Sequence, residues 1–147
     1  MGSAEPVKLR ILTFEDLESV TEIDFQLLGK RRRDYWETRL ERSAFCGVPS
    51  LAAEVDGKMA GFVLGTVSGW EYGIPESVAW IDTMGVLKEY QSKGVARLLL
   101  TEMTAMFKKV GIHTVYTFVN WRDLDLLQFF DKMGFTRGDM IHLELTI

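Results

Sequence analysis

The chain has 147 residues, which is enough for one ordinary domain and too few for a second core. Hydrophobic residues make up 47% of it and charged residues 26%, a composition typical of globular proteins and too apolar for a disordered chain. The net charge of −4 argues against nucleic acid as the main partner, because binding a polyanion needs clustered positive charge.

One basic run, 30–33, departs from this acidic balance, and Asp34, Glu37 and Glu41 follow it closely. Interleaved carboxylates favour a solvated helix face over a nucleic-acid contact. The single cysteine, Cys46, excludes an internal disulfide, and a buried structural thiol is favoured over a nucleophile.

Residues 1–6 are small and polar, show no secretory pattern, and are expected to form an unstructured leader. No apolar run reaches the roughly 20 residues needed to span a bilayer. We therefore expect one domain over residues 1–147, a cytoplasmic location and no membrane partner.

The first part of the chain predicts a strand followed by two helices. Residues 7–12 form a short β-type run. Apolar residues at three- and four-residue spacing over 16–28 predict a helix that Gly29 ends, and a second helix is expected near 31–43.

A hairpin comes next. Asp56-Gly57 is a two-residue turn signal between the strands predicted at 51–55 and 58–67. Gly61 and Gly65 inside the second strand predict either a bulge or the close approach of another element.

The second half of the chain begins with a loop rich in glycine, serine and aromatic residues at 68–77. Two strands, two helices and a final strand or hairpin follow, in the order 78–87, 94–110, 113–119, 123–133 and 135–147. Hairpin-linked strands followed by a strand–helix–strand crossover predict a mixed sheet with helices on both faces, an α/β (mixed α+β) fold.

The segment from Ile81 to Ala96 is a strand that passes through a turn into a helix, with Gly94 and Ala96 where the helix begins. Small residues let a ligand approach the backbone, and the free N–H groups of a first helical turn attract anions such as pyrophosphate. Lys93 and Arg97 add positive charge. The pattern matches neither a P-loop nor a dinucleotide fingerprint, and it indicates a phosphate or carboxylate site or a plain strand–helix turn.

The run Gln91-Ser92-Lys93-Gly94-Val95-Ala96 resembles the Q/R-x-x-G-x-G/A signature of the GNAT superfamily of N-acetyltransferases. A second block, 119–135, resembles the stretch of that family that ends in aromatic-acid-Lys-x-Gly-Phe, although core packing also explains most of its phenylalanines. The element order over 7–147 resembles the family's fold.

The resemblance implies a GNAT acyl-CoA N-acyltransferase fold. Its central mixed, mostly antiparallel sheet has six to seven strands and splays between strands four and five, with about four helices on both faces. It implies acetyl-CoA as co-substrate, no metal, and by analogy a homodimer. The residues implied to hold acetyl-CoA are Met84, Gly85, Val86, Gln91, Ser92, Lys93, Gly94, Val95, Ala96, Arg97, Asp123 and Phe130.

Acyl transfer to an amine needs a proton acceptor, because an amine is mostly protonated near neutral pH. An acid often occupies the position of Asp82 in related enzymes, and period two predicts that it shares a face with Met84 and Val86. Two alternatives stay open: Asp82 pairs with a neighbouring lysine or arginine, or Glu71 is the base.

Two positions depart from the family. Phe130 stands where many members carry a tyrosine that protonates the leaving thiolate, and a phenylalanine cannot donate a proton. Asp123 stands where many carry asparagine, and it can still cap a helix. Tyr116 or Tyr72 could replace the missing acid.

In this family the first two helices and the loop between strands three and four select the acceptor. Aromatic rings and carboxylates there suit a cationic amine. The candidate acceptor contacts are Asp24, Trp70, Glu71 and Tyr72.

We therefore expect an acetyl-CoA-dependent N-acetyltransferase that acts on a primary amine of a small molecule or a protein by direct attack in a ternary complex. The alternative, favoured by Phe130, is a non-catalytic acyl-CoA sensor or interaction module. A nucleic-acid or partner-binding domain that uses residues 30–33 is the third reading.

Overall fold

A computed structural model describes residues 6–43, 49–69 and 71–147. Cys46, Trp70 and most of the predicted leader lie outside these residues. Contacts group the chain into two compact units, Met1–Thr117 and Phe118–Ile147. The expectation of one domain over the whole chain stays a prediction.

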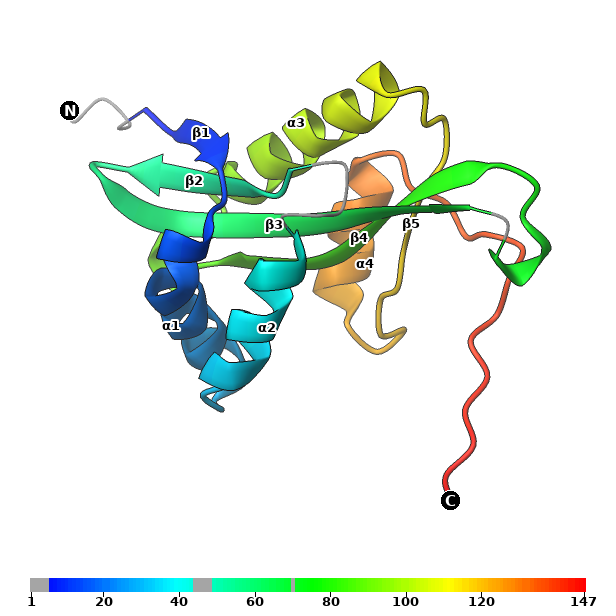
Figure 1. Ribbon diagram of the computed structural model, residues 1–147, viewed down its shortest axis with the longest axis horizontal. Helices are drawn as coiled ribbons and strands as arrows, with labels where there is room; N and C mark the ends of the chain where they lie inside the picture. Colours follow the sequence, from blue (N-terminus) through cyan, green and yellow to red (C-terminus); the bar gives the residue numbers. More distant parts are fainter. Residues whose placement is uncertain (1–5, 44–48, 70) are drawn as a thin grey trace. The chain divides into compact units, whose positions relative to one another are not determined.

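The first unit is built on a mixed sheet whose strands follow one another in chain order (Figure 1). Neighbouring strands are antiparallel except for the last two, which are parallel. The mixed, mostly antiparallel sheet predicted from the sequence is confirmed. Its strands are β1 Lys8–Ile11, β2 Leu51–Val55, β3 Lys58–Gly69, β4 Ser77–Val86 and β5 Val115–Thr117.

Helices cover both faces of this sheet, as predicted (Figure 1). One face carries α1 (Leu17–Leu28) and α2 (Arg33–Ser43), and the other carries α3 (Val95–Lys109). Short 3-10 turns precede or link these elements at Phe14–Asp16, Glu71–Gly73 and Lys88–Tyr90.

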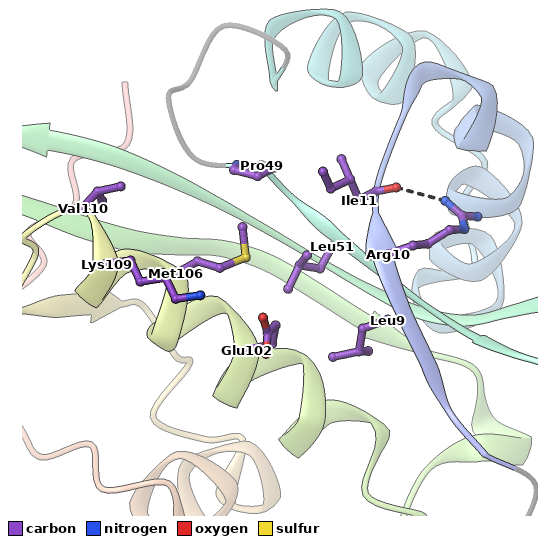
Figure 2. Close-up of a pocket in the computed structure, with 9 residues that line it drawn as sticks. All are labelled: Leu9, Arg10, Ile11, Pro49, Leu51, Glu102, Met106, Lys109 and Val110. Atoms are coloured by element: carbon purple, nitrogen blue, oxygen red, sulfur yellow. Dashed lines mark hydrogen bonds between the residues drawn. The ribbon is translucent and has the colours of Figure 1, made fainter.

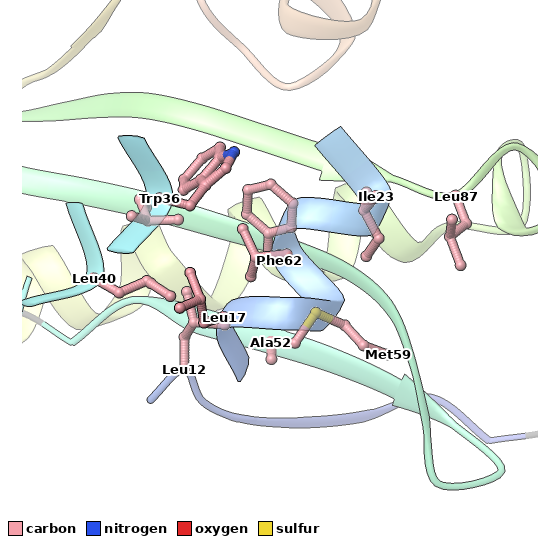
Figure 3. Close-up of a cluster of buried hydrophobic side chains, with 11 residues drawn as sticks. Leu12, Leu17, Ile23, Trp36, Leu40, Ala52, Met59, Phe62 and Leu87 are labelled. Carbon is pink, nitrogen blue, oxygen red and sulfur yellow. The ribbon is translucent and has the colours of Figure 1, made fainter. Parts of the chain in front are cut away.

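The face under α1 and α2 holds a dense apolar cluster (Figure 3). Trp36 of α2 is fully buried, and its ring meets Phe62 of β3 edge to face at 5.4 Å between centroids. Leu40, one turn further along α2, is buried in the same cluster. These contacts fix α2 against the sheet, because large buried aromatic and aliphatic side chains dominate core energetics.

The opposite face shows why β3 contains glycines. A Cβ on Gly61 would come within 3.3 Å of Val95 on α3, and one on Gly65 within 2.7 Å of Phe107 on the same helix. The ladder also shifts register next to Gly65. The extra residue at that shift belongs to β4, whereas β3 has its own extra residue at Ala60, next to Gly61, where it pairs with β2. Close approach by another element is therefore confirmed at both glycines, and a bulge within β3 is confirmed beside Gly61.

The turn between β2 and β3 is the predicted two-residue hairpin. Asp56 and Gly57 both adopt positive φ, 51° and 73°, as a type I′ turn requires. Gly29 ends α1 in the left-handed conformation, with φ of 79°.

In the second unit, α4 (Leu124–Lys132) is the predicted last helix, and Gly134 follows it at a φ of 93°. The strand or hairpin predicted over 135–147 is wrong: no strand forms there, so the described sheet has five strands rather than six or seven. A strand needs side chains that alternate between two faces and also a neighbouring strand that accepts and donates its backbone hydrogen bonds. Residues 135–147 have only the alternation. Ile141, Leu143 and Leu145 are each at least 80% exposed.

Among the described residues, no helix is both long enough and apolar enough to cross a membrane.

Candidate active site

The strands β4 and β5 separate part of the way along β4. They pair only at Ala79–Ile81 with Val115–Thr117, and the Thr117 hydroxyl donates to the Ile81 carbonyl oxygen at 3.0 Å where the pairing stops. Beyond that point, β4 residues 82–86 have no strand partner on this edge within the described chain. Backbone groups on such an edge can pair with an extended ligand. The separation agrees with the predicted splay between strands four and five.

Asp82 lies at a bulge in β4. Thr83 is opposite Leu64 and Ile81 is opposite Gly65, so Asp82 is the extra residue. Bulges re-aim side chains and are common beside active sites.

The bulge sends the Asp82 side chain to the face of α1 and α2, where it contacts Arg39 of α2. Val86 instead belongs to the α3 face, since a Cβ on its opposite partner Gly61 would touch both Val86 and Val95. The prediction that Asp82 shares a face with Met84 and Val86 is therefore wrong, because period two holds only in a regular ladder.

Two side chains from different elements hold the Asp82 carboxylate. The Arg39 guanidinium donates to Oδ2, and the Thr66 hydroxyl on β3 lies 3.5 Å from Oδ1. The Asp82 side chain keeps 31% of its surface exposed and that of Arg39 keeps 17%. Partial burial raises the pKa of Asp82, and the Arg39 charge and the Thr66 hydroxyl offset this only in part. The predicted pairing with an arginine is confirmed as a contact, and the result is a carboxylate with a raised pKa rather than a lowered one.

The turn before α3 exposes backbone at a helix N-terminus. Gln91 to Gly94 are exposed, and Ser92 and Gly94 adopt positive φ of 64° and 83°. The N-cap residue of α3 is Gly94, which has no side chain that could accept from the first-turn N–H groups. These groups therefore stay available to an anion.

Side chains around this turn fix it in place and add charge. Gln91 Nε2 donates to the Val86 carbonyl oxygen at 2.9 Å and ties the turn to the end of β4. Val95 is buried against the sheet, whereas Arg97 is exposed. Lys93 Nζ lies 5.6 Å from the centre of the Tyr90 ring. The free β4 edge and the helix N-terminus thus join at one short turn, which suits a ligand with an extended polar arm and a pyrophosphate.

The predicted acceptor contact Asp24 is engaged within the fold. Its two carboxylate oxygens accept from Arg32 Nη2 at 2.8 Å and Nε at 3.0 Å, and the residue is 8% exposed. Burial raises the pKa of Asp24, but the bonds and charge of Arg32 and a contribution from Trp36 together outweigh burial and hold the pKa below its ordinary value. Two further arginines of the basic run also bind α1 carboxylates, Arg31 to Glu22 and Arg33 to Glu18.

The structure does not bring the alternative base Glu71 next to Asp82. Glu71 is exposed beyond the end of the β3–β4 hairpin, whose last pair is Gly69 with Ser77. Asp82 lies five positions after Ser77 along β4, roughly 16 Å at the usual rise.

Tyr72 and Tyr116 both lie against Trp80 of β4, with ring centroids 6.4 Å and 5.1 Å away. Tyr72 is 78% exposed. Trp80 Nε1 donates to Ser68 Oγ at 2.9 Å. Three aromatic rings therefore form a row two residues before the candidate base. Trp70 lies outside the described residues.

In the second unit, Asp123 caps α4 as predicted: its Oδ1 accepts from the backbone N–H of Leu126 at 3.1 Å. Phe130 is buried, and its ring lies edge to face with Phe129 and Phe135, at 5.3 Å and 5.0 Å. Core packing is confirmed for Phe130, whereas Phe129 and Phe135 are half-buried and pack against its ring.

A separate hollow of about 670 Å³ lies between β1 and α3 (Figure 2). Leu9, Leu51 and Met106 line it together with Glu102 and Lys109. It contains neither Asp82 nor any residue of the turn 91–94.

Sequence reasoning missed Arg39, Thr66 and Trp80. Arg39 carried a usable signal, because it lies three positions after Trp36 and therefore beside the buried stripe of α2. Thr66 and Trp80 carried none, since only strand register decides which polar residues lie opposite one another.

Solved structures of similar architecture cover almost the whole chain. An aminoglycoside N-acetyltransferase, AAC(6')-Iy, in complex with CoA matches with a TM-score of 0.85 at 16% identity, over 99% of this chain and 98% of that one. A ribosomal-protein-alanine N-acetyltransferase from Brucella melitensis biovar Abortus 2308 matches with a TM-score of 0.77 at 18% identity, over 97% and 99%. A transcriptional regulator from Bacillus halodurans C-125 matches with a TM-score of 0.81 at 16% identity, over 97% and 100%.

At such identities these matches show the fold alone. A search of curated proteins finds no match to the chain. The model of the acetyltransferase (GNAT) family matches residues 12–135, most of the chain. The chain therefore belongs to the acetyltransferase (GNAT) family.

Proposed function

We propose that the protein is an N-acetyltransferase that moves the acetyl group of acetyl-CoA to a primary amine bound in the same complex. The observation that carries this proposal is the position of Asp82. A bulge turns its carboxylate toward α2 at the point where β4 leaves β5, and its pKa is raised. A partly exposed carboxylate with a raised pKa beside an open strand edge suits a general base.

The donor side fits acetyl-CoA. The exposed turn from Gln91 to Gly94 and the N–H groups that start α3 would hold the pyrophosphate, with Lys93 and Arg97 adding positive charge. The open edge at 82–86 would pair with the pantetheine arm. Two solved structures of the same fold are complexes with CoA or with a CoA–acetylneamine bisubstrate analogue. When bound, acetyl-CoA supplies the acetyl group as a thioester.

Asp82 performs the proton transfer in this proposal. Its carboxylate takes one proton from the acceptor ammonium, which leaves a neutral amine able to attack the thioester carbon. A backbone N–H on the open edge stabilises the developing negative charge. Two protons leave the ammonium nitrogen in all: Asp82 passes one to solvent, and the other goes to the departing sulfur.

The acceptor is an amine with a positive charge near an apolar or ring surface. Asp82 supplies the negative charge, and the row formed by Tyr72, Trp80 and Tyr116 supplies aromatic faces. Aminoglycosides and an alanine of a ribosomal protein are the two acceptor classes that the names of similar structures offer.

One observation favours a second candidate, a non-catalytic acyl-CoA sensor. Phe130 is buried among aromatic rings and offers no proton to a leaving thiolate. A thiol is nevertheless a fairly good leaving group, with an ordinary pKa near 8.5, so turnover does not require that donor.

The test measures the release of free thiol from acetyl-CoA with two acceptors in separate reactions. One is sisomicin, the ligand of an aminoglycoside acetyltransferase of similar fold, and the other is a peptide that begins with alanine. We expect release with at least one of them, and acetyl-CoA binding by calorimetry without any amine. Binding without release on a wider amine panel would favour the sensor. Absence of acetyl-CoA binding would overturn both candidates.

A further inference from the structure

Arg39 differs from Arg31, Arg32 and Arg33 in the carboxylate that it binds. Arg31 and Arg32, which precede α2, and Arg33, its first residue, all bind carboxylates on α1, so these pairs tie the start of α2 to α1. Arg39 binds Asp82 on β4, 43 residues away in the sequence. Of these four ion pairs, this one joins the helix layer to the proposed base.

The helix that carries Arg39 is firmly seated. Trp36, three positions earlier on the same side of α2, is completely buried against Phe62, and the adjacent Leu40 is buried as well. Only 17% of the Arg39 side chain is exposed. An arginine held this way presents its guanidinium in a defined orientation, which a solvent-exposed arginine does not.

The two oxygens of Asp82 are in different situations. Oδ2 accepts a charge-assisted bond from Arg39, whereas Oδ1, among the residues that the structure describes, has only the 3.5 Å contact with the Thr66 hydroxyl. A carboxylate oxygen has two lone-pair sites, and a hydrogen bond of this length to Thr66 leaves Oδ1 able to take a proton from a ligand.

We infer that Arg39 is the positioning residue for Asp82: it holds Oδ2 from α2 and so leaves Oδ1 as the oxygen that takes the proton of the acceptor amine. This inference rests on the proposed function and goes beyond it, because it makes the seating of α2 a condition for catalysis.

The charges around Asp82 make the inference measurable. From α2 the carboxylate faces Arg39, and from β3 it faces the neutral Thr66, whereas the Tyr116 ring of β5 lies against Trp80. Partial burial raises the pKa of Asp82, and Arg39 opposes this effect. Loss of the arginine charge must therefore raise the pKa further. Since a base works only when ionised, the acidic limb of the activity profile must move to higher pH.

The first measurement needs no acceptor. The carboxyl carbon of Asp82 is titrated by NMR in the full chain, with Asp82→Asn to identify its signal. We expect Arg39→Gln to raise the pKa of Asp82 by about one unit, the lower end of the effect of a close opposite charge. Arg33→Gln, a matched change on the same helix away from the sheet, leaves it unmoved. An equal pKa in Arg39→Gln and the unmodified chain overturns the inference.

The second measurement is the pH profile of thiol release with acetyl-CoA and whichever of sisomicin and the alanine-starting peptide is the better acceptor. We expect Arg39→Gln to lower kcat about 10- to 100-fold with the KM for acetyl-CoA unchanged, and to move the acidic limb upward. Arg39→Lys restores most of the rate, because it keeps the charge. Arg39→Met keeps the apolar stem and replaces the glutamine variant if that one does not fold.

The outcomes separate the two proposals. No thiol release by the unmodified chain with any amine of the wider panel overturns the proposed function and the role of Arg39 with it. Release that depends on Asp82 but is the same in Arg39→Gln or Arg39→Met overturns the role of Arg39 alone. A lower kcat with an unmoved acidic limb also overturns the role of Arg39, because general loosening of α2 would explain that result.

Discussion

Asp24–Arg32 and Asp82–Arg39 are both aspartate–arginine ion pairs, yet the fold shifts the pKa values of the two carboxylates in opposite directions. Both oxygens of Asp24 accept from Arg32, and the pKa of Asp24 is lowered. One oxygen of Asp82 accepts from Arg39, and the pKa of Asp82 is raised. Burial raises the pKa of both groups. At Asp24 the bonds and charge of Arg32, with a contribution from Trp36, outweigh burial. At Asp82, by contrast, Arg39 and Thr66 offset burial only in part. An arginine partner alone therefore does not distinguish a structural aspartate from a candidate base.

The largest expected difference is in catalysis. Asp82→Asn removes the proposed proton acceptor while keeping the shape of the side chain, so kcat/KM for thiol release should fall about 10²- to 10⁴-fold. Glu22→Gln breaks the exposed ion pair with Arg31 and serves as the control, with activity unchanged. Full activity of Asp82→Asn across the pH range would show that another group is the base.

The free energy of unfolding should respond more to a change at Asp24 than to one at Asp82, the reverse of the order expected for catalysis. Asp24→Asn loses charge-assisted bonds at a buried site and should lower the free energy of unfolding by about 1–3 kcal/mol in urea titrations. Asp82→Asn should change it by less than about 1 kcal/mol, since the asparagine oxygen still accepts from Arg39. A larger loss for Asp82→Asn would make the Asp82 pair the structural one.

The pH dependence of stability should have opposite signs at the two sites. The lowered pKa of Asp24 contributes stability above the unfolded value of about 3.9, and that stability is lost as pH falls through the folded pKa. The raised pKa of Asp82 removes stability as pH rises from the same unfolded value through its folded pKa. Unfolding free energies of each Asn variant, subtracted from those of the unmodified chain at several pH values, measure both slopes. Slopes of equal sign would contradict the assigned pKa directions.

The smallest effect concerns the donor side and separates it from the acceptor side. Gly94→Ala places a Cβ at a φ of 83°, which strains the turn by about 1–2 kcal/mol although nothing blocks the Cβ. Acetyl-CoA binding should weaken about 3- to 10-fold by calorimetry. Gly29→Ala introduces a similar strain, at a φ of 79°, after α1 and should leave that affinity unchanged. Equal losses in both variants would mean that general destabilisation explains the effect.

Much of the fold and the turn before α3 could be predicted because local chemistry determines them. Asp56-Gly57 is a hairpin since both residues tolerate positive φ, and Gly29 ends a helix for the same reason. The turn from Gln91 to Gly94 could be found because its residues are consecutive. The strand predicted over 135–147 failed, since a strand needs a partner that no local pattern supplies.

The sequence by itself determined the family, the order of the elements as far as α4 and the turn that leads into α3, because adjacent residues encode them. Tertiary structure alone decided what surrounds Asp82. A bulge opposite Leu64 and Gly65 chose its face, and α2, seated by Trp36, brought Arg39 to it from 43 residues away. Register and helix docking are long-range packing outcomes, and they determine whether an aspartate in a sequence is a buried anchor or a group that can accept a proton.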